Sequence, residues 1–211
     1  MIVAPSILSA DFYHLGQEIE RIEACTSWLH FDVMDGQFVP NISFGYKVLG
    51  DIDKHSNLFM DVHLMVQEPM HLYEAFKKHG ADLITFHAEA VRSIEDNIKA
   101  IKAMGLKVGI SIKPNTKPES LEPYMEDLDL ILIMSVYPGF GGQSFIESSL
   151  ETLDYLVEKK KDHHFLIEMD GGIGPDNAPD LFRRGADVLV AGSAVFGSED
   201  YCETIRKMTA Q

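Results

Sequence analysis

Cysteine is scarce in this chain of 211 residues, and its scarcity excludes two kinds of chemistry. Cys25 and Cys202 are the only cysteines, and neither lies in a CxxC pair or next to a side chain suited to act as its base. Dithiol redox chemistry and an activated cysteine nucleophile are therefore not indicated. The simple interpretation is a protein of the reducing cytoplasm, in which cysteines stay as thiols.

Long apolar runs and basic side chains are also in short supply. No stretch approaches the roughly 18 apolar residues of a membrane helix, and the opening MIVAPSILSADF lacks the basic region of an export signal.

With 18 Lys and Arg against 33 Asp and Glu, the formal net charge is -15. Such a field repels nucleic acid and anionic membranes. An anionic ligand would have to be bound by backbone amides and helix N-termini.

What the chain does have is a regular alternation of short apolar runs with amphipathic stretches. Eight runs have the composition of buried strands, and they span residues 2–7, 28–34, 58–63, 83–87, 107–112, 130–136, 165–170 and 188–192. A helix is expected after each strand, in units of about 26 residues, near the lower limit for a TIM barrel. The prediction is an α/β protein with a single (β/α)₈ barrel domain over residues 1–211. A doubly wound open sheet is less favoured, because it would separate the acidic and imidazole residues described below.

The first expected helix illustrates the local pattern. Leu15, Ile19 and Ile22 fall on one face, which predicts a stripe that packs against the sheet. Asp11 is placed to cap the helix N-terminus, and Glu18 is expected off the apolar stripe.

Acidic and imidazole side chains stand near the ends of three of the apolar runs. His30 and Asp32 occur in WLHFDVMDG, His63 in LFMDVHLM and Asp170 in FLIEMDGG. Residues two apart in a strand share a face, and the C-terminal strand ends of a barrel meet at one mouth. Mixed imidazole and carboxylate ligation suits Zn²⁺, Fe²⁺, Mn²⁺ or Co²⁺ equally, so the pattern predicts one divalent metal cation without identifying it.

Three glycine-rich segments follow the last three strands: VYPGFGGQSF (136–145), DGGIGP (170–175) and VAGSAVF (190–196). A single such segment is usually a tight turn. Three in succession, in the part of a barrel that typically binds phosphate, predict a phosphate site.

Methionines also occur at strand ends near the expected mouth. Met34, Met65 and Met134 are either core filler or a water-poor wall beside a charged intermediate. His87, at the end of the fourth strand, is expected to support a ligand or to be structural.

The segments APSILSAD, HFDVMDGQFVPNISFG, DVHLM, VYPGFGGQSF, IEMDGGI and AGSAVF resemble the signature blocks of ribulose-phosphate 3-epimerases. The resemblance extends from Ala4 to about Phe196, with the blocks in order. It implies a (β/α)₈ barrel that interconverts D-ribulose 5-phosphate and D-xylulose 5-phosphate with a divalent metal, in a homo-oligomer, either a dimer or a hexamer.

The resemblance also assigns roles to residues. It implies Asp32 and Asp170 as acid and base, one for each face of the substrate, and Met34, Met65 and Met134 as a hydrophobic wall. The implied metal ligands are His30, Asp32, His63 and Asp170. The implied substrate-binding residues are Ser6, His63, Gly139, Phe140, Gly141, Gly142, Asp170, Gly171, Gly172, Gly192 and Ser193. Epimerisation would then be a two-base proton transfer at C3 through a metal-stabilised enediolate.

Alternatives remain at this stage. Gln37 and Tyr137 depart from the pattern common in the family, so allulose-6-phosphate 3-epimerases, which act on a hexulose phosphate, are a second possibility. A Schiff-base aldolase would need a strand-end lysine, and Lys113 is the only candidate, followed by Pro114. A non-catalytic sugar-phosphate-binding barrel would gain nothing from the paired aspartates.

Overall fold

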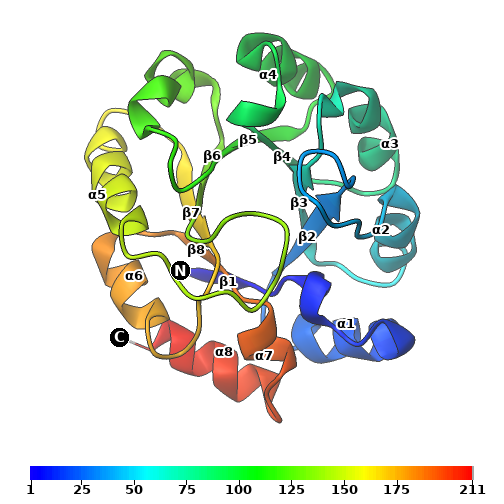
Figure 1. Ribbon diagram of the computed structural model, residues 1–211. Helices are drawn as coiled ribbons and strands as arrows, with labels where there is room; N and C mark the ends of the chain where they lie inside the picture. The colour runs from blue at the N-terminus through cyan, green and yellow to red at the C-terminus, as the bar shows by residue number, and fades with distance from the viewer. Residues whose placement is uncertain (211) are drawn as a thin grey trace.

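A computed structural model describes residues 1–210 and shows eight parallel strands arranged as a barrel (Figure 1). The strands are β1 (Ile2–Ala4), β2 (Trp28–Met34), β3 (Phe59–Met65), β4 (Leu83–His87), β5 (Lys107–Ile112), β6 (Leu130–Met134), β7 (Leu166–Asp170) and β8 (Val188–Val190). Their order is β1-β8-β7-β6-β5-β4-β3-β2. A parallel bridge between Ser6 and His30 joins the two ends. The predicted TIM barrel is confirmed, and each of the eight apolar runs contains or overlaps a strand.

Helices surround the barrel (Figure 1). They are α1 (Leu15–Glu23), α2 (Tyr46–Asp53), α3 (Tyr73–Lys78), α4 (Ile94–Ala103), α5 (Ser149–Lys159), α6 (Ala178–Arg184), α7 (Ser193–Phe196) and α8 (Tyr201–Thr209). The connection from β5 to β6 differs from expectation, because it holds a 3₁₀ helix (Pro118–Asp127) with Pro123 inside it. A proline there has no N–H to donate to an α-helical ladder. Within the part of the chain that the structure describes, no helix is long and apolar enough to cross a membrane.

The strand register decides which side chains meet inside the barrel. Along β2 and β3, His30 pairs with Asp61, Asp32 with His63, and Met34 with Met65. Successive residues of a strand point to opposite faces, so these pairs face the interior while Phe31 and Val62 pack outward under the helices. The interior therefore carries polar groups where a barrel usually carries branched apolar ones.

The entry into α1 confirms one local expectation and corrects another. Asp11 is a cap, but of a short 3₁₀ helix (Phe12–His14) that leads into α1. Glu18 was expected off the buried stripe, and this is wrong. Its side chain is buried and accepts a hydrogen bond of 2.6 Å from the Tyr201 hydroxyl. Tyr201 begins α8, so the reason lies in the packing of two helices that are far apart in sequence.

The expectation of separate thiols is also wrong, since Cys25 and Cys202 form a disulfide with a Cα–Cα distance of 5.1 Å. Cys25 follows α1 and Cys202 lies in the first turn of α8, with 177 residues between them in sequence. No local motif signals such a pair. The two cysteines meet because the last helix packs beside the first.

Reducing this disulfide is expected to destabilise the fold by about 2–4 kcal/mol, since the bond closes a very long loop in the unfolded chain. Urea unfolding with and without dithiothreitol measures the difference. The Cys25→Ser/Cys202→Ser double variant is the control, because it should have the lower stability in both conditions. Equal stability of the wild type with and without reductant, together with two titratable thiols in the untreated protein, would contradict the pairing.

Candidate active site

Four predicted ligand residues come together inside the barrel. His30 and Asp32 on β2, His63 on β3 and Asp170 on β7 each offer one nitrogen or oxygen atom, and these atoms all lie within 4.8 Å of one another. Among residues 1–210, the three from β2 and β3 are buried and Asp170 is slightly exposed. The expected cluster of two imidazoles and two carboxylates is therefore present.

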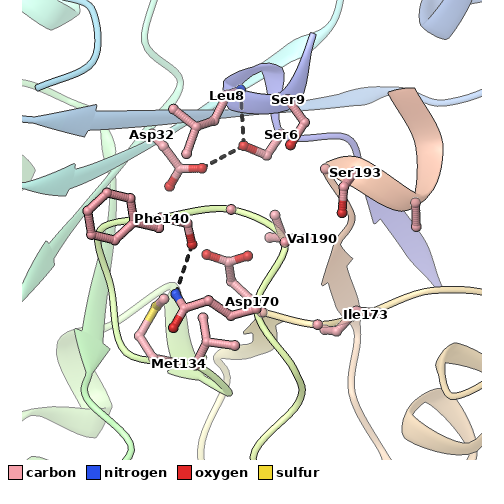
Figure 2. A pocket seen from close by; sticks show the side chains of 18 of the residues that line it. Ser6, Leu8, Ser9, Asp32, Met134, Phe140, Asp170, Ile173, Val190 and Ser193 are labelled. Carbon is pink, nitrogen blue, oxygen red and sulfur yellow. Dashed lines mark hydrogen bonds between the residues drawn. The ribbon is translucent and has the colours of Figure 1, made fainter. Parts of the chain in front are cut away.

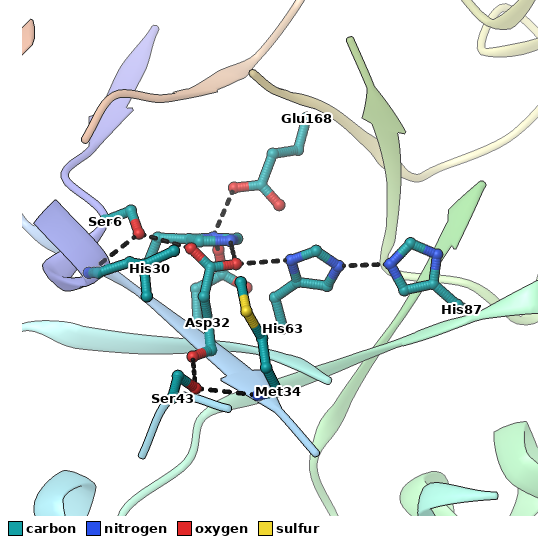
Figure 3. Close-up of polar contacts among 10 residues, drawn as sticks. Ser6, His30, Asp32, Met34, Ser43, His63, His87 and Glu168 are labelled. Atoms are coloured by element: carbon teal, nitrogen blue, oxygen red, sulfur yellow. Dashed lines mark hydrogen bonds and ion pairs between the residues drawn. The ribbon is translucent and has the colours of Figure 1, made fainter. Parts of the chain in front are cut away.

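Asp32 is the centre of the hydrogen bonds in this cluster (Figure 3). Its Oδ1 lies 2.9 Å from His63 Nδ1 and 3.3 Å from His30 Nε2, and its Oδ2 accepts a 2.5 Å hydrogen bond from the Ser6 hydroxyl. Ser6 follows β1, so residues of three different strand segments converge on one carboxylate.

The position of these residues along the strands differs from expectation. Only Asp170 is the last residue of its strand. His30, Asp32 and His63 lie inside β2 and β3, which continue to Met34 and Met65. The strand predicted over residues 58–63 was too short, because His63 was taken as its last residue whereas β3 ends at Met65. The cluster consequently sits slightly below the mouth, one or more residues before Met34 and Met65 along the same strands.

The two carboxyl groups are in different electrostatic environments. Burial opposes ionisation of Asp32, but the charge of His30 and the close contacts with His30 and His63 hold its pKa well below the usual range. Burial, reinforced by the charge of Asp32, raises the pKa of Asp170 to about 7. Two carboxyls with separated pKa values can serve as a base and an acid at the same pH.

The donor set fits a divalent cation. The Nε2 atom of His30 is buried, and it lies 3.3 Å from Asp32 Oδ1 without the geometry of a hydrogen bond. A buried unpaired nitrogen is costly unless something binds it. The cluster of two imidazole nitrogens and two carboxylate oxygens is a set that Zn²⁺, Mn²⁺, Fe²⁺ and Co²⁺ accept.

Above the cluster lies a pocket of about 560 Å³ (Figure 2). The side chains of Asp32 and Asp170 face the same space from different sides of the barrel. Met34, Met65 and Met134 also line it and are almost fully buried. The pocket lining includes Ser6, Gly139, Phe140, Gly141, Gly142, Gly171, Gly172, Gly192 and Ser193, so the structure brings together these sequence-predicted residues as well. The segment after β6 crosses the barrel opening in Figure 1.

The glycines of this pocket have distinct structural reasons. Gly142 has φ +71° with open space around it, whereas Gly172 has φ +64° and a Cβ there would lie 2.4 Å from the backbone nitrogen of Phe145. Gly172 therefore allows two loops to pack together, while Gly142 leaves backbone accessible at the pocket. Gly192 and Ser193 begin α7, where the first backbone amides have no acceptor within the helix.

Two buried acids were missed by sequence reasoning. Asp61 Oδ2 lies 2.6 Å from His30 Nδ1, and Glu168 Oε1 lies 3.6 Å from the same nitrogen. Both side chains are fully buried. Burial and the neighbouring Asp61 raise the pKa of Glu168 well above its usual range. Strand alternation could have found them, because Asp61 stands two residues before His63 and Glu168 two before Asp170.

His87, on β4, does not join the four clustered residues but contacts one of them. Its Nε2 lies 2.9 Å from Nε2 of His63 (Figure 3). Burial lowers the pKa of His87 to about 4. The expectation of a supporting or structural position therefore fits its place.

An eight-stranded parallel barrel with a polar pocket at the C-terminal ends of its strands is the arrangement of a TIM-barrel enzyme. A family model described as "Ribulose-phosphate 3 epimerase family" matches residues 2–196. The chain therefore belongs to the ribulose-phosphate 3-epimerase family, and it is an isomerase of the epimerase type.

Named relatives agree with this placement in the family, and a solved structure agrees with the fold. The ribulose-phosphate 3-epimerase of Bacillus subtilis (strain 168) is 44% identical over 210 residues, which are 98% of this chain and 97% of the relative. The chloroplastic ribulose-5-phosphate-3-epimerase of Arabidopsis thaliana is 44% identical over 100% of this chain and 76% of its own length. The fold is similar to 3-hexulose-6-phosphate synthase from Salmonella typhimurium, with a TM-score of 0.72, 18% identity, and coverage of 99% of this chain and 97% of that one.

Proposed function

We propose that this epimerase interconverts D-ribulose 5-phosphate and D-xylulose 5-phosphate by proton transfer at C3. The observation that carries the proposal is the pair Asp32 and Asp170, which face one pocket from β2 and β7. Inverting a carbon beside a ketone requires removal of a weakly acidic proton on one face and its return on the other. Two carboxyl groups on different walls meet this requirement, with an enediolate between the two transfers.

The environments of the two acids support a division of roles. Asp32 is held as a carboxylate by Ser6 and the two histidines, so it is ready to accept a proton. Asp170 is the more basic of the two carboxyl groups, because burial and the charge of Asp32 raise its pKa to about 7 in the metal-free protein. The roles exchange when the reaction runs in the opposite direction.

We propose His30, Asp32, His63 and Asp170 as ligands of one divalent cation, Zn²⁺, Fe²⁺, Mn²⁺ or Co²⁺. Such a cation, when bound, supplies Lewis-acid stabilisation of the negative charge that develops on the substrate oxygens. Ser6 orients the Asp32 carboxylate through its hydroxyl. Met34, Met65 and Met134 exclude water from the reacting carbons, which strengthens the electrostatic interactions there.

We propose that the phosphate of the substrate binds the backbone at the other end of the pocket. Gly142, Gly172, Gly192 and Ser193 line that end. Because the formal net charge is -15, a dianion has to be bound by local amides rather than by a general positive field. Gly139, Phe140 and Gly141 belong to the segment after β6 and would cover the bound sugar.

Turnover measured side by side on ribulose 5-phosphate, allulose 6-phosphate and free ribulose tests the substrate. We expect the highest kcat/KM for ribulose 5-phosphate, and a steep loss without the phosphate, because binding of that remote group positions C3. Higher kcat/KM on allulose 6-phosphate would assign a hexulose substrate. Equal efficiency on free ribulose would remove the phosphate site from the proposal.

Three further properties are proposed with this function. Residues 1–211 act as one domain, the protein works in the cytoplasm, and it assembles with copies of itself as a dimer or a hexamer. The family relationship supports the assembly. For the compartment, a relative from Oryza sativa subsp. japonica is named as a cytoplasmic isoform, whereas the relative from Arabidopsis thaliana is chloroplastic. The acidic charge supports the absence of nucleic acid and membrane partners.

A further inference from the structure

His63 stands in a row of four side chains that leads from the pocket towards the surface. Its Nδ1 lies 2.9 Å from Asp32 Oδ1, and its Nε2 lies 2.9 Å from His87 Nε2. His87 Nδ1 in turn lies 3.3 Å from Glu89 Oε2. Figure 3 shows Asp32, His63 and His87 in this order. Both histidine side chains are fully buried, and the Glu89 side chain is 23% exposed.

The row has more contacts than protons. Its three contacts join a carboxylate, two imidazoles and a second carboxylate, and each contact needs one proton between two acceptor atoms. Two neutral imidazoles carry two protons. One contact therefore lacks a proton, and the direction of the hydrogen bonds decides which contact it is.

Glu89 favours one of the two possible directions. Its Oε1 accepts a 2.8 Å hydrogen bond from the backbone amide of Lys113 and another from the Thr116 hydroxyl, and its Oε2 faces His87. Both end groups of the row, Asp32 and Glu89, are carboxylates that can only accept. A divalent cation between Asp32 and His63 would take the place of the proton at that end, and His87 would then present Nδ1–H to Glu89. His87 Nε2 is then an acceptor, His63 donates Nε2–H to it, and His63 Nδ1 is left as a lone pair that faces Asp32.

We propose that Glu89 and His87 are positioning residues that fix the tautomer of His63, so that its Nδ1 lone pair is free to bind the divalent cation beside Asp32. The cation then occupies the one contact that has no proton. The inference rests on the metal site proposed above. It gives a role to His87, which is buried, and to Glu89, which is partly exposed, although neither takes part in proton transfer to the substrate.

Glu89→Gln is the decisive variant because the structure fixes the orientation of the new amide. The Lys113 amide and the Thr116 hydroxyl both donate to the Oε1 position, so the carbonyl oxygen of the glutamine belongs there and its NH₂ group faces His87 Nδ1. The amide would then donate where the carboxylate accepted. The row would reverse, and His63 would present Nδ1–H to Asp32 in place of the lone pair.

Titration of the protein with Zn²⁺ against a chelator of known affinity measures the effect. Loss of such support around a metal ligand typically weakens binding by about 10–100-fold, and we expect an increase of this order in the Kd of Glu89→Gln for Zn²⁺. Thr116→Val is the matched control, because it removes a neighbouring contact of Glu89 and keeps the contact with His87. Its Kd should be that of the wild type. Nitrogen NMR of the zinc-loaded wild type should show His87 protonated at Nδ1 and His63 at Nε2.

Two results would overturn the inference alone: equal Kd values for Glu89→Gln and the wild type, or the opposite tautomers in the wild type. The NMR measurement decides if Glu89→Gln does not fold. If the wild type itself binds no divalent cation, the proposed metal site fails and this inference fails with it.

Discussion

Asp170→Asn is expected to lower kcat for epimerisation by at least about 10²–10⁴-fold, the usual contribution of a general acid or base. Asparagine preserves the shape of the side chain and an oxygen that a metal can bind, but it can neither accept nor release the proton of C3. Asp32→Asn should cause a comparable loss on the opposite face. Each substitution alone should lower kcat, because the reaction needs one acid–base group on each side of the substrate.

Solvent deuterium incorporation at C3 separates proton abstraction from full epimerisation. If the two acids serve opposite faces, each variant should still exchange the proton of one epimer faster than that of the other, with the preference reversed between the variants. Asp51→Asn is the control, because this exposed residue of α2 pairs with Lys47 and Lys54 away from the pocket. A normal epimerisation rate in either active-site variant would show that its acid–base assignment is wrong.

Removing divalent metal with a chelator is expected to abolish epimerisation, and Zn²⁺, Mn²⁺, Fe²⁺ or Co²⁺ should restore it. The negative charge that develops next to the reacting carbon has no arginine or lysine to stabilise it among the residues that line the described pocket. Activity should be measured after dialysis against the chelator and again after each metal is added. Full activity of protein shown by elemental analysis to be free of metal would contradict the metal requirement.

The affinity of the protein for the divalent cation should increase with pH. Ligands must lose their protons before they bind a metal. The pKa of Asp170 is raised to about 7 in the metal-free protein, and the charges of Asp61 and Asp32 outweigh burial and raise that of His30 as well. Affinity should therefore rise as the pH increases through 7 and fall below it, by about tenfold per pH unit for each proton displaced. Titrations at several pH values check the slope.

The cluster of four side chains proposed as ligands was predictable from sequence because it depends on short-range periodicity. His30 and Asp32 share a face of one strand wherever that strand lies, and Asp170 and the glycines after it are adjacent in the chain. Once the alternation of apolar runs and amphipathic stretches indicates a barrel, the C-terminal ends of the strands have to meet. Asp61 and Glu168 obeyed the same alternation and were missed only because the pattern was applied to fewer positions than it covers.

Other features depend on contacts that no local pattern encodes. The Cys25–Cys202 disulfide and the buried Glu18–Tyr201 hydrogen bond exist because α8 packs beside α1. The 3₁₀ helix before β6 follows from where prolines stand in the chain, yet the strand alternation alone predicted an ordinary helix.

The chain's own pattern of residues was enough to establish the barrel, the four clustered side chains and the glycine loops, because strand periodicity and the closure of eight units leave few other arrangements. The ionisation of those side chains was decided only by tertiary structure. Burial and the distance to neighbouring charges separate the pKa values of Asp32 and Asp170, and the row from His63 to Glu89 depends on the register of β3 with β4 and on a loop after β5. Electrostatic interactions of this kind depend on distances of a few ångströms between residues far apart in sequence, which only the folded chain defines.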